Sequence, residues 1–367
     1  MRNQLLLVAV LCASALASVC VAQTRPIIRV AIHDPAQDIT DKPDSWFSSD
    51  EGIARINKII SYQLPNGGWE KGYGDPQARA PGQEPSEWVG RGTIDNNFTY
   101  TEIRALARAY NLTKRQNVLD SFNRGLDFLF TAQYPNGGWP QRYPTPDNYG
   151  RDITFNDDAM INVMKLMQDI TKDPQFAFAN AARRAKAREA LDRALDCTLK
   201  CQVVTNGELT VWPQQCDPVT LKPTKARSFE LESISGGESA GIVLFLMTLD
   251  DPVPEVRHAI RSAVAWYERS KVLGKRIEKK PDPTLPHGND VYLVDDPNAP
   301  PLWGRFYDLQ TNQVFFCGRD SVKKSSLDQI EAERRAGYVW LAPYGKAVLE
   351  QYKSWSARYG GSDANSK

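Results

Sequence analysis

The chain has 367 residues, with 45 lysines and arginines against 44 aspartates and glutamates. This even balance, with no basic run, argues against a nucleic-acid-binding protein. There are only three histidines, His33, His258 and His287, which argues against a histidine-based zinc site and against Ser-His-Asp catalysis.

The first 22 residues have the pattern of a secretory signal peptide. Arg2 is followed by an apolar run from Leu5 to Ala22, and polar sequence starts directly after it. Signal peptides are removed during export, so the pattern predicts a secreted protein, periplasmic or extracellular, without stable membrane association. An N-terminal membrane anchor, or a lipid anchor at Cys20, is the alternative; the apolar core is short for a membrane span.

The rest of the chain divides into three parts. Residues 23–48 are polar with scattered prolines, and we expect an extended lead-in. Residues 49–356 are expected to form a single domain, and residues 357–367 a disordered tail. The cysteines beyond the signal peptide are too few for a disulfide scaffold, and we expect buried thiols or a single bridge. They are Cys197, Cys201, Cys216 and Cys317.

A turn motif occurs twice, seventy positions apart. Gln63 to Trp69 and Gln133 to Trp139 share Gln-x-Pro-Asn-Gly-Gly-Trp, and Thr205-Asn206-Gly207 ahead of Trp212 is a weaker third copy. Pro-Asn-Gly-Gly breaks a helix by turn chemistry. We interpret the motif as a structural tie between helices, with each tryptophan packed on the next unit.

Each copy of the turn lies between two helical patterns. Apolar residues recur at three- and four-residue spacing on both sides of it, for example Ile53, Ile56 and Ile59 before the first copy. The second helix of the first unit starts at about Thr99. Further helices are predicted at 255–271 and 328–352, separated by a proline-rich, loop-rich segment over 275–325.

Neither helix of such a unit can bury its apolar face alone, so neighbouring units must stack. Three two-helix repeats of about seventy residues, completed by closing helices and a loop-rich C-terminal segment, predict an all-α fold, an (α/α)3 toroid. The loops that follow the turns would then open on the same rim of the ring.

Polar segments precede the second helix of each predicted unit. They are Thr93 to Asn96, Ile153 to Asp158 and Arg227 to Glu230. Helix capping explains such residues in the simplest way. Three carboxylate-bearing segments on one rim also suggest a site for a hard cation such as calcium, which prefers oxygen ligands.

Arginines are expected on the same rim. Arg227, Arg305 and Arg319 each present a planar fork that suits carboxylate groups. The simple alternative is that each arginine pairs with a nearby aspartate, such as Asp308 or Asp320. Beside acidic residues, the three together suggest a polyanionic ligand that is partly bridged by metal.

Taken in order, these motifs resemble polysaccharide lyase family 10, the pectate lyases with an (α/α)3 toroid. The resemblance runs from about residue 50 to 356. It rests on the two PNGGW turns and on four ordered segments. These are Thr93 to Asn96, Phe155 to Asp158, Lys225 to Ser239, and Trp303 to Asp320.

The resemblance implies a secreted, monomeric enzyme that cleaves polygalacturonate by calcium-dependent β-elimination. It implies that Arg227 is the catalytic residue, proposed as the base at C5 of the sugar. Asp95, Asp157 and, less directly, Glu230 would be the calcium-associated carboxylates. The implied substrate-binding residues are Asn96, Lys225, Arg305 and Arg319.

Three alternatives share features of this sequence. The Gln-x-x-x-Gly-x-Trp pattern also occurs in triterpene cyclases, but the chain has no Asp-x-Asp-Asp acid motif and is too short for two such barrels. A non-catalytic polysaccharide-binding toroid would keep the turns and could lose Arg227 or Asp157, both of which are present. A toroid lyase acting on another uronan, such as alginate, would typically use tyrosine and histidine.

Overall fold

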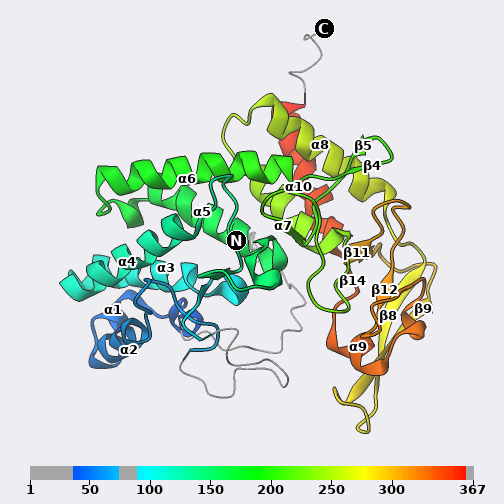
Figure 1. The fold of residues 1–367 in the computed structure, drawn as a ribbon, viewed down its shortest axis with the longest axis horizontal. Helices are drawn as coiled ribbons and strands as arrows, with labels where there is room; N and C mark the ends of the chain where they lie inside the picture. Colours follow the sequence, from blue (N-terminus) through cyan, green and yellow to red (C-terminus); the bar gives the residue numbers. More distant parts are fainter. Residues whose placement is uncertain (1–35, 74–88, 361–367) are drawn as a thin grey trace, which may run out of the picture. The chain divides into compact units, whose positions relative to one another are not determined.

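The fold is described from a computed structural model, in which residues 36–73 and 89–360 are placed. The predicted signal peptide lies outside the described residues, as do residues 23–35 of the lead-in and residues 361–367. Ten α-helices occur in the described part (Figure 1). They are α1 (Asp44–Phe47), α2 (Asp50–Ser61), α3 (Tyr100–Thr113), α4 (Gln116–Ala132), α5 (Ala159–Lys172), α6 (Ala181–Lys200), α7 (Gly236–Leu246), α8 (Pro254–Arg269), α9 (Ala332–Gly337) and α10 (Tyr344–Tyr359).

The long helices pack in two rows. The helices that precede the turns, α2, α4, α6 and α8, contact one another in sequence order. The helices that follow them, α3, α5, α7 and α10, form the second row. Their apolar faces meet in one core that includes Ile103, Leu126 and Val163, each with no exposed surface. The predicted repeat of helix pairs is therefore confirmed, while its closure into a toroid stays a prediction.

Short antiparallel strand pairs join successive units. They bring the turn-following segments of neighbouring units together, because β1 pairs with β2, β3 with β6, and β7 with β11. The strands in these pairs are β1 (Gly92–Thr93), β2 (Arg142–Tyr143), β3 (Ile153–Thr154), β6 (Gln215–Cys216), β7 (Ile234–Ser235) and β11 (Phe306–Tyr307). The other pairs are β4 (Val204–Thr205) with β5 (Glu208–Leu209), β8 (Lys275–Pro281) with β9 (Asn289–Asp295), β10 (Trp303–Gly304) with β14 (Leu341–Ala342), and β12 (Phe316–Cys317) with β13 (Lys323–Lys324).

The glutamine of each turn ties its unit to the next one. The Gln63 side-chain amide donates to the carbonyl of Gly67 in its own turn and to that of Ser121 on α4, at 2.8 and 2.9 Å. Gln133 makes the same two bonds, to Gly137 and to Ala190 on α6. The interpretation of the motif as a structural tie is therefore confirmed.

The third copy departs from the predicted alignment. Gln202 bonds to the carbonyls of Thr210 and of Ala259 on α8, so Thr210 occupies the place of the first glycine. Asn206 and Gly207, which the sequence comparison aligned with that turn, instead form the tip of the β4–β5 hairpin with positive φ angles of 53° and 82°. The inserted hairpin explains why the third copy looked degenerate.

A fourth copy of the tryptophan anchor was not predicted. In each unit an indole N–H donates to a carbonyl near the end of the preceding helix, which fixes where the following segment begins. The bonds run from Trp69 to Ile59, Trp139 to Leu129, Trp212 to Thr198 and Trp303 to Tyr267, at 2.9, 2.7, 2.6 and 2.8 Å. Helices α8 and α10 with Trp303 therefore form a fourth unit, whose two helices are separated by a long insertion.

Two predicted elements of the C-terminal third are wrong. The segment 275–325 contains the seven-residue strands β8 and β9, which pair in full register and place Val291 in a second apolar cluster. The single helix predicted over 328–352 is interrupted, because α9 ends at Gly337 and α10 begins only after Pro343. A proline lacks the N–H that a continuous helix requires.

The ends of the domain also differ from the expected boundaries. Helix α1 lies within the segment expected to be an extended lead-in, and α10 continues to Tyr359, beyond residue 356. Cys197, Cys201, Cys216 and Cys317 are buried and unbridged, as one of the two predicted alternatives has it. Among the described residues, no helix has both the length and the apolar character that a membrane span requires.

Candidate active site

Two tight turns, one before α3 and one before α5, position polar residues of the site. Asn96 and Asp157 lie at matching positions in the 3₁₀ turns that precede α3 and α5, with φ angles of 51° and 50°. Asparagine and aspartate tolerate this left-handed conformation better than other non-glycine residues. The capping alternative does not describe these residues, since no side-chain cap is formed at the N-cap position of α3 or α5.

The third equivalent segment is not the one predicted from spacing. The backbone N–H of Thr93, Thr154 and Ser235 donates to the carbonyl of the preceding core tryptophan in units one, two and three. Ser235 to Ser239, with Glu238 in the first turn of α7, is therefore the true counterpart of the first two segments. The Arg227–Glu230 segment belongs to the long loop before it, whose length distorts the seventy-residue spacing.

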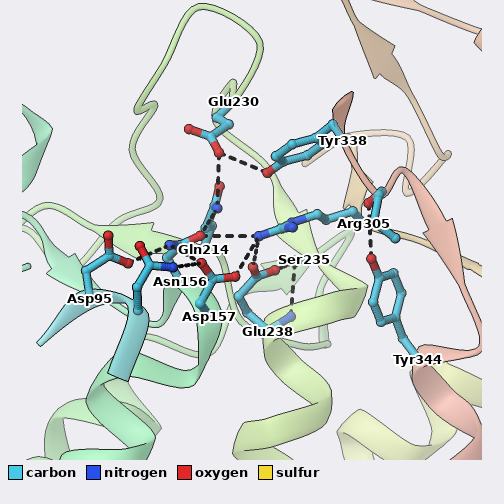
Figure 2. Close-up of polar contacts among 12 residues, drawn as sticks. Asp95, Asn156, Asp157, Gln214, Glu230, Ser235, Glu238, Arg305, Tyr338 and Tyr344 are labelled. Atoms are coloured by element: carbon cyan, nitrogen blue, oxygen red, sulfur yellow. Dashed lines mark hydrogen bonds and ion pairs between the residues drawn. The ribbon is translucent and has the colours of Figure 1, made fainter. Parts of the chain in front are cut away.

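Asn156 lies at the centre of the site (Figure 2). Its side-chain N–H₂ group donates to Asp95 Oδ1 at 3.3 Å and to Asp157 Oδ2 at 3.2 Å. Its oxygen accepts from the Gln214 amide and from Arg305 Nη2. One asparagine therefore links carboxylates of the first two units to groups of the third and fourth.

Arg305 is held against a buried carboxylate. Its Nη2 lies 2.5 Å from Glu238 Oε1 and 3.6 Å from Asp157 Oδ1. Ser235 donates to the other oxygen of Glu238, which fixes the carboxylate. Burial alone would lower the pKa of Arg305, but Glu238 and the other acidic groups around it, Asp157 among them, together outweigh burial and raise that pKa above its ordinary value. The guanidinium is therefore charged and rigidly placed.

Arg227 is paired with Glu230 in a bidentate way. Nε and Nη2 of Arg227 donate to the two oxygens of Glu230, which is buried, while the arginine side chain is 45% exposed. Burial would raise the pKa of Glu230, but Arg227, together with Arg305 and Tyr338, outweighs burial and lowers that pKa to about 2. Burial opposes the charge on Arg227 too, yet Glu230 raises the pKa of Arg227 above its ordinary value.

This pairing leaves one nitrogen of Arg227 available. Among the described residues Nη1 makes no hydrogen bond, because Glu230 occupies Nε and Nη2. The guanidinium carbon lies 4.7 Å from the ring centre of Phe229, and that ring is buried in the second apolar cluster. Arg227 therefore has a fixed orientation, with Nη1 as its free donor.

Tyr338 connects the two arginine pairs. Its hydroxyl donates to Glu230 Oε1 at 2.9 Å (Figure 2). The guanidinium of Arg305 lies 4.6 Å from its ring centre and that of Arg227 lies 5.8 Å away. Such cation–π contacts stabilise a cation over an aromatic ring. The Gln214 amide, 3.4 Å from Glu230 Oε1, makes a second link between the Arg227 pair and Asn156.

The predicted site residues fall into three groups. Asp95, Asn96, Asp157 and Arg305 meet around Asn156, since Asn96 also donates to Asp157 Oδ2 at 3.4 Å. Arg227 and Glu230 join them through Gln214. Arg319 and Lys225 stay apart from this network. Arg319 is exposed, pairs with Glu333 and reaches only the Phe229 ring, at 5.8 Å, while Lys225 is exposed and has no polar partner in the described part of the chain.

Several polar residues of the site were not predicted. They are Lys71, Asn156, Gln214, Glu238 and Tyr338. Asn156 and Glu238 stand inside motifs that the sequence singled out, but nothing in the sequence marks which motif residue faces the site. Two of the five follow a regular rule: Lys71 and Gln214 come two residues after a core tryptophan, as does the predicted Arg305.

The predicted metal ligands can be compared with calcium chemistry. Asp95 and Asp157 both lie within hydrogen-bond distance of one amide nitrogen, and the side-chain oxygen of Gln214 is buried without a hydrogen-bond partner. Such carboxylate and amide oxygens suit calcium. In the described ranges, no three histidine, cysteine, aspartate or glutamate side chains are grouped as a metal site. Glu230, the third predicted calcium-associated carboxylate, accepts hydrogen bonds from Arg227 at both of its oxygens.

Comparisons with known proteins identify the family of the chain. The family of pectic acid lyases matches residues 63–349. The solved structure of a family 10 polysaccharide lyase from Cellvibrio cellulosa is 31% identical, with a TM-score of 0.71 over 88% of this chain and 96% of that chain. A mutant of a family 10 lyase from the same organism, in complex with trigalacturonic acid, also is 31% identical, with a TM-score of 0.71 over 87% and 97% of the two chains. No curated protein matches the sequence significantly. The chain therefore belongs to the pectic acid lyase family and is a pectate lyase of polysaccharide lyase family 10.

Proposed function

We propose that this lyase cleaves polygalacturonate, the de-esterified form of pectin, by calcium-dependent β-elimination, and that it is secreted. The observation that carries the proposal is that two oriented arginines belong to the network of the predicted carboxylates. Arg305 lies 3.6 Å from Asp157, and Arg227 is connected to it through Glu230, Gln214 and Asn156. Fixed cations suit a polymer with one carboxylate per sugar. The complex of a similar lyase with trigalacturonic acid supports this substrate class. Secretion rests on the signal-like pattern of residues 1–22.

In the proposed reaction the C5–H bond of a galacturonate breaks and its proton leaves to a base. The electron pair forms the C4=C5 double bond while the bond from C4 to the glycosidic oxygen breaks, and that oxygen takes a proton from solvent. No water is added across the bond, so the paired carboxylates of a glycosidase are not required. The negative charge develops next to the sugar carboxylate, where cations stabilise it.

Arg227 is the residue that we place at C5. Its Nη1 is the free nitrogen of a guanidinium that Glu230 and Phe229 hold in one orientation. Glu230 orients Arg227 but also raises the pKa of the guanidinium, so the neutral form that would accept the proton is scarcer at a given pH. A base of this kind acts through its neutral form, so the proposal predicts that the rate rises with pH until the protein loses its fold.

Arg305, Asp95 and Asp157 have supporting roles in this proposal. Arg305 would bind a substrate carboxylate while Glu238 keeps it in place. Asp95, Asp157 and the free oxygen of Gln214 would hold calcium, with substrate carboxylates and water completing the six to eight oxygens that this ion prefers. When bound, calcium would neutralise the substrate carboxylate and so make the C5 proton more acidic. Arg319 and Lys225 remain proposed outer contacts to the polymer, as does Asn96 next to Asp95.

The proposal predicts an unsaturated product that depends on calcium. On polygalacturonate with calcium, ultraviolet absorbance should rise as the C4=C5 bond forms. Chelation should lower the rate by about 100-fold or more, because a bound metal ion contributes several kcal/mol to such steps, and added calcium should restore it. Release of reducing ends without absorbance would mean hydrolysis and would refute elimination. An equal rate with chelator would refute calcium dependence alone.

Tyr338 provides a second test, on the link between the two arginines. In Tyr338→Phe the ring remains over Arg305, while Glu230 loses a donor at 2.9 Å. Arg227 is then held less firmly, and we expect kcat to fall about 3- to 10-fold, in line with one hydrogen bond to a charged group, with KM within about twofold. Steady-state kinetics measures this.

Tyr134→Phe is the matched control for Tyr338→Phe. It also removes a hydroxyl hydrogen bond, to the carbonyl of Arg151, but it contacts neither arginine of the site. Its kcat should stay close to that of the unmodified enzyme. If both variants lost activity equally, the effect of Tyr338 would be a general loss of packing rather than the positioning of Arg227.

A further inference from the structure

One position recurs in all four units, two residues after the core tryptophan. It is occupied by Lys71, Gln141, Gln214 and Arg305. Because each tryptophan makes the same hydrogen bond to the preceding helix, the backbone brings these four positions to equivalent places. Gln214 and Arg305 both bond to Asn156, so this position faces the active site. The same rule places Lys71 there.

Lys71 forms a buried ion pair with a proposed calcium ligand. Its Nζ lies 2.7 Å from Asp95 Oδ2, and the two side chains are only 10% and 3% exposed. The other oxygen of that carboxylate, Oδ1, accepts from Asn156. Both oxygens of Asp95 therefore have donors in this structure, and a metal ion could bind Oδ2 only by replacing the ammonium group.

The other two cations of the site are also paired with carboxylates. Arg227 pairs with Glu230 and Arg305 with Glu238, just as Lys71 pairs with Asp95. Asp157 has no such close partner, since its nearest cation is Arg305 at 3.6 Å, and it is 34% exposed. Of the two carboxylates proposed to bind calcium, Asp157 is the more exposed and has the longer ion pair.

We propose that Lys71 makes calcium binding conditional on the substrate; this inference rests on the calcium site of the proposed function. Calcium at Asp95 would lie next to the displaced Lys71 ammonium group, and two cations this close repel each other unless another anion neutralises them. The carboxylates of polygalacturonate are such anions. Calcium binds Asp95 while a substrate carboxylate pairs with Lys71. Because the two events occur together, each ligand strengthens the binding of the other. Lys71 is thus a positioning residue that couples the two.

The test compares calcium affinity with and without trigalacturonate. Lys71→Gln removes the charge and installs the residue that the second and third units carry at this position, so the fold should accept it. Lys71→Met removes the charge without adding a possible oxygen ligand, and Lys71→Arg keeps the charge. Calcium binding is followed by titration calorimetry in an Arg227→Ala background, which prevents turnover, and circular dichroism confirms folding.

Without trigalacturonate, Lys71→Gln and Lys71→Met should bind calcium about tenfold or more tightly than the Lys71 protein, because a competing cation next to the site is gone. Lys71→Arg should stay weak, and trigalacturonate should tighten calcium binding most where the charge is kept. Equal affinity in all four proteins, with calcium still bound in the presence of trigalacturonate, would overturn the role of Lys71 and leave the proposed function intact. No calcium binding by any of them with trigalacturonate would refute the calcium site itself.

Discussion

Replacing Arg227 with alanine is expected to lower kcat about 10³-fold or more, within the range of general acid–base catalysis, while KM changes only a few-fold. The guanidinium is held by two bonds from Nε and Nη2 to a buried carboxylate and by the face of Phe229. Its remaining nitrogen is the only part directed to a ligand in our proposal. Absorbance assays on polygalacturonate with calcium measure the loss. Near-normal turnover would contradict the assignment.

Arg227→Lys distinguishes a base from a fixed positive charge. The ordinary pKa of lysine is about 10.4, well below that of arginine. If Arg227 removes the proton, the variant should regain activity between about pH 8 and pH 10.5, because the neutral amine accumulates there. If Arg227 acts only as a cation, activity should fall over the same range. We expect the rise, and a fall would assign proton removal to another group.

Arg319→Ala is the matched control for both variants. Arg319 is another arginine near Phe229, but it is exposed, pairs with Glu333 and lies outside the network around Asn156. Its loss should raise KM a few-fold and leave kcat close to normal, since exposed ion pairs contribute little. A loss of kcat as large as that of Arg227→Ala would mean that charge near Phe229, rather than Arg227 itself, carries the reaction.

Gly137→Ala should be strongly destabilising, by about 2–6 kcal/mol. Gly137 has a φ of 94°, and a Cβ there would lie 2.1 Å from the carbonyl oxygen of Arg193 on α6. Positive φ costs a non-glycine residue roughly 1–3 kcal/mol, and the clash with helix backbone costs about 1–3 kcal/mol more. The turn must then move away from α6, which strains the Gln133 tie to Ala190.

Gly207→Ala is the control for that change. Gly207 also has a positive φ, 82°, but a Cβ there would meet nothing within 4 Å. It should lower stability by only about 1–2 kcal/mol, the cost of the left-handed backbone. The midpoint of urea unfolding, followed by tryptophan fluorescence, compares the two. Equal losses would show that the approach of the turn to α6 contributes nothing.

The repeat and its helices were accessible from the sequence because their physical causes are local. Pro-Asn-Gly-Gly can only form a turn, and apolar residues at three- and four-residue spacing can only share the face of a helix. The same reasoning missed the β8–β9 hairpin and the break before Pro343. Strand β8 is mostly charged, so it has no apolar pattern, and it is paired with β9 through the backbone, whose hydrogen bonds leave no trace in side-chain periodicity.

The candidate site was predictable in its residue types but not in its partners. Asp95, Asp157, Arg227 and Arg305 were singled out from ordered motifs, and the fold brings them into one network. Spacing assigned the third acidic segment to Glu230, whereas the backbone places Glu238 there. An insertion in a loop changes spacing without moving the structural frame, so only hydrogen bonds to the core tryptophans identify the true counterpart.

The sequence by itself determined the repeat, the helix pairs, the near-neutral charge and the family, since each depends on residue type and order along the chain. Only the tertiary structure decided which charges are paired: Lys71 with Asp95, Arg227 with Glu230 and Arg305 with Glu238. Two of these pairs join residues at least 24 positions apart. Electrostatic energy depends on distance and burial in space, and neither quantity can be derived from spacing in the chain.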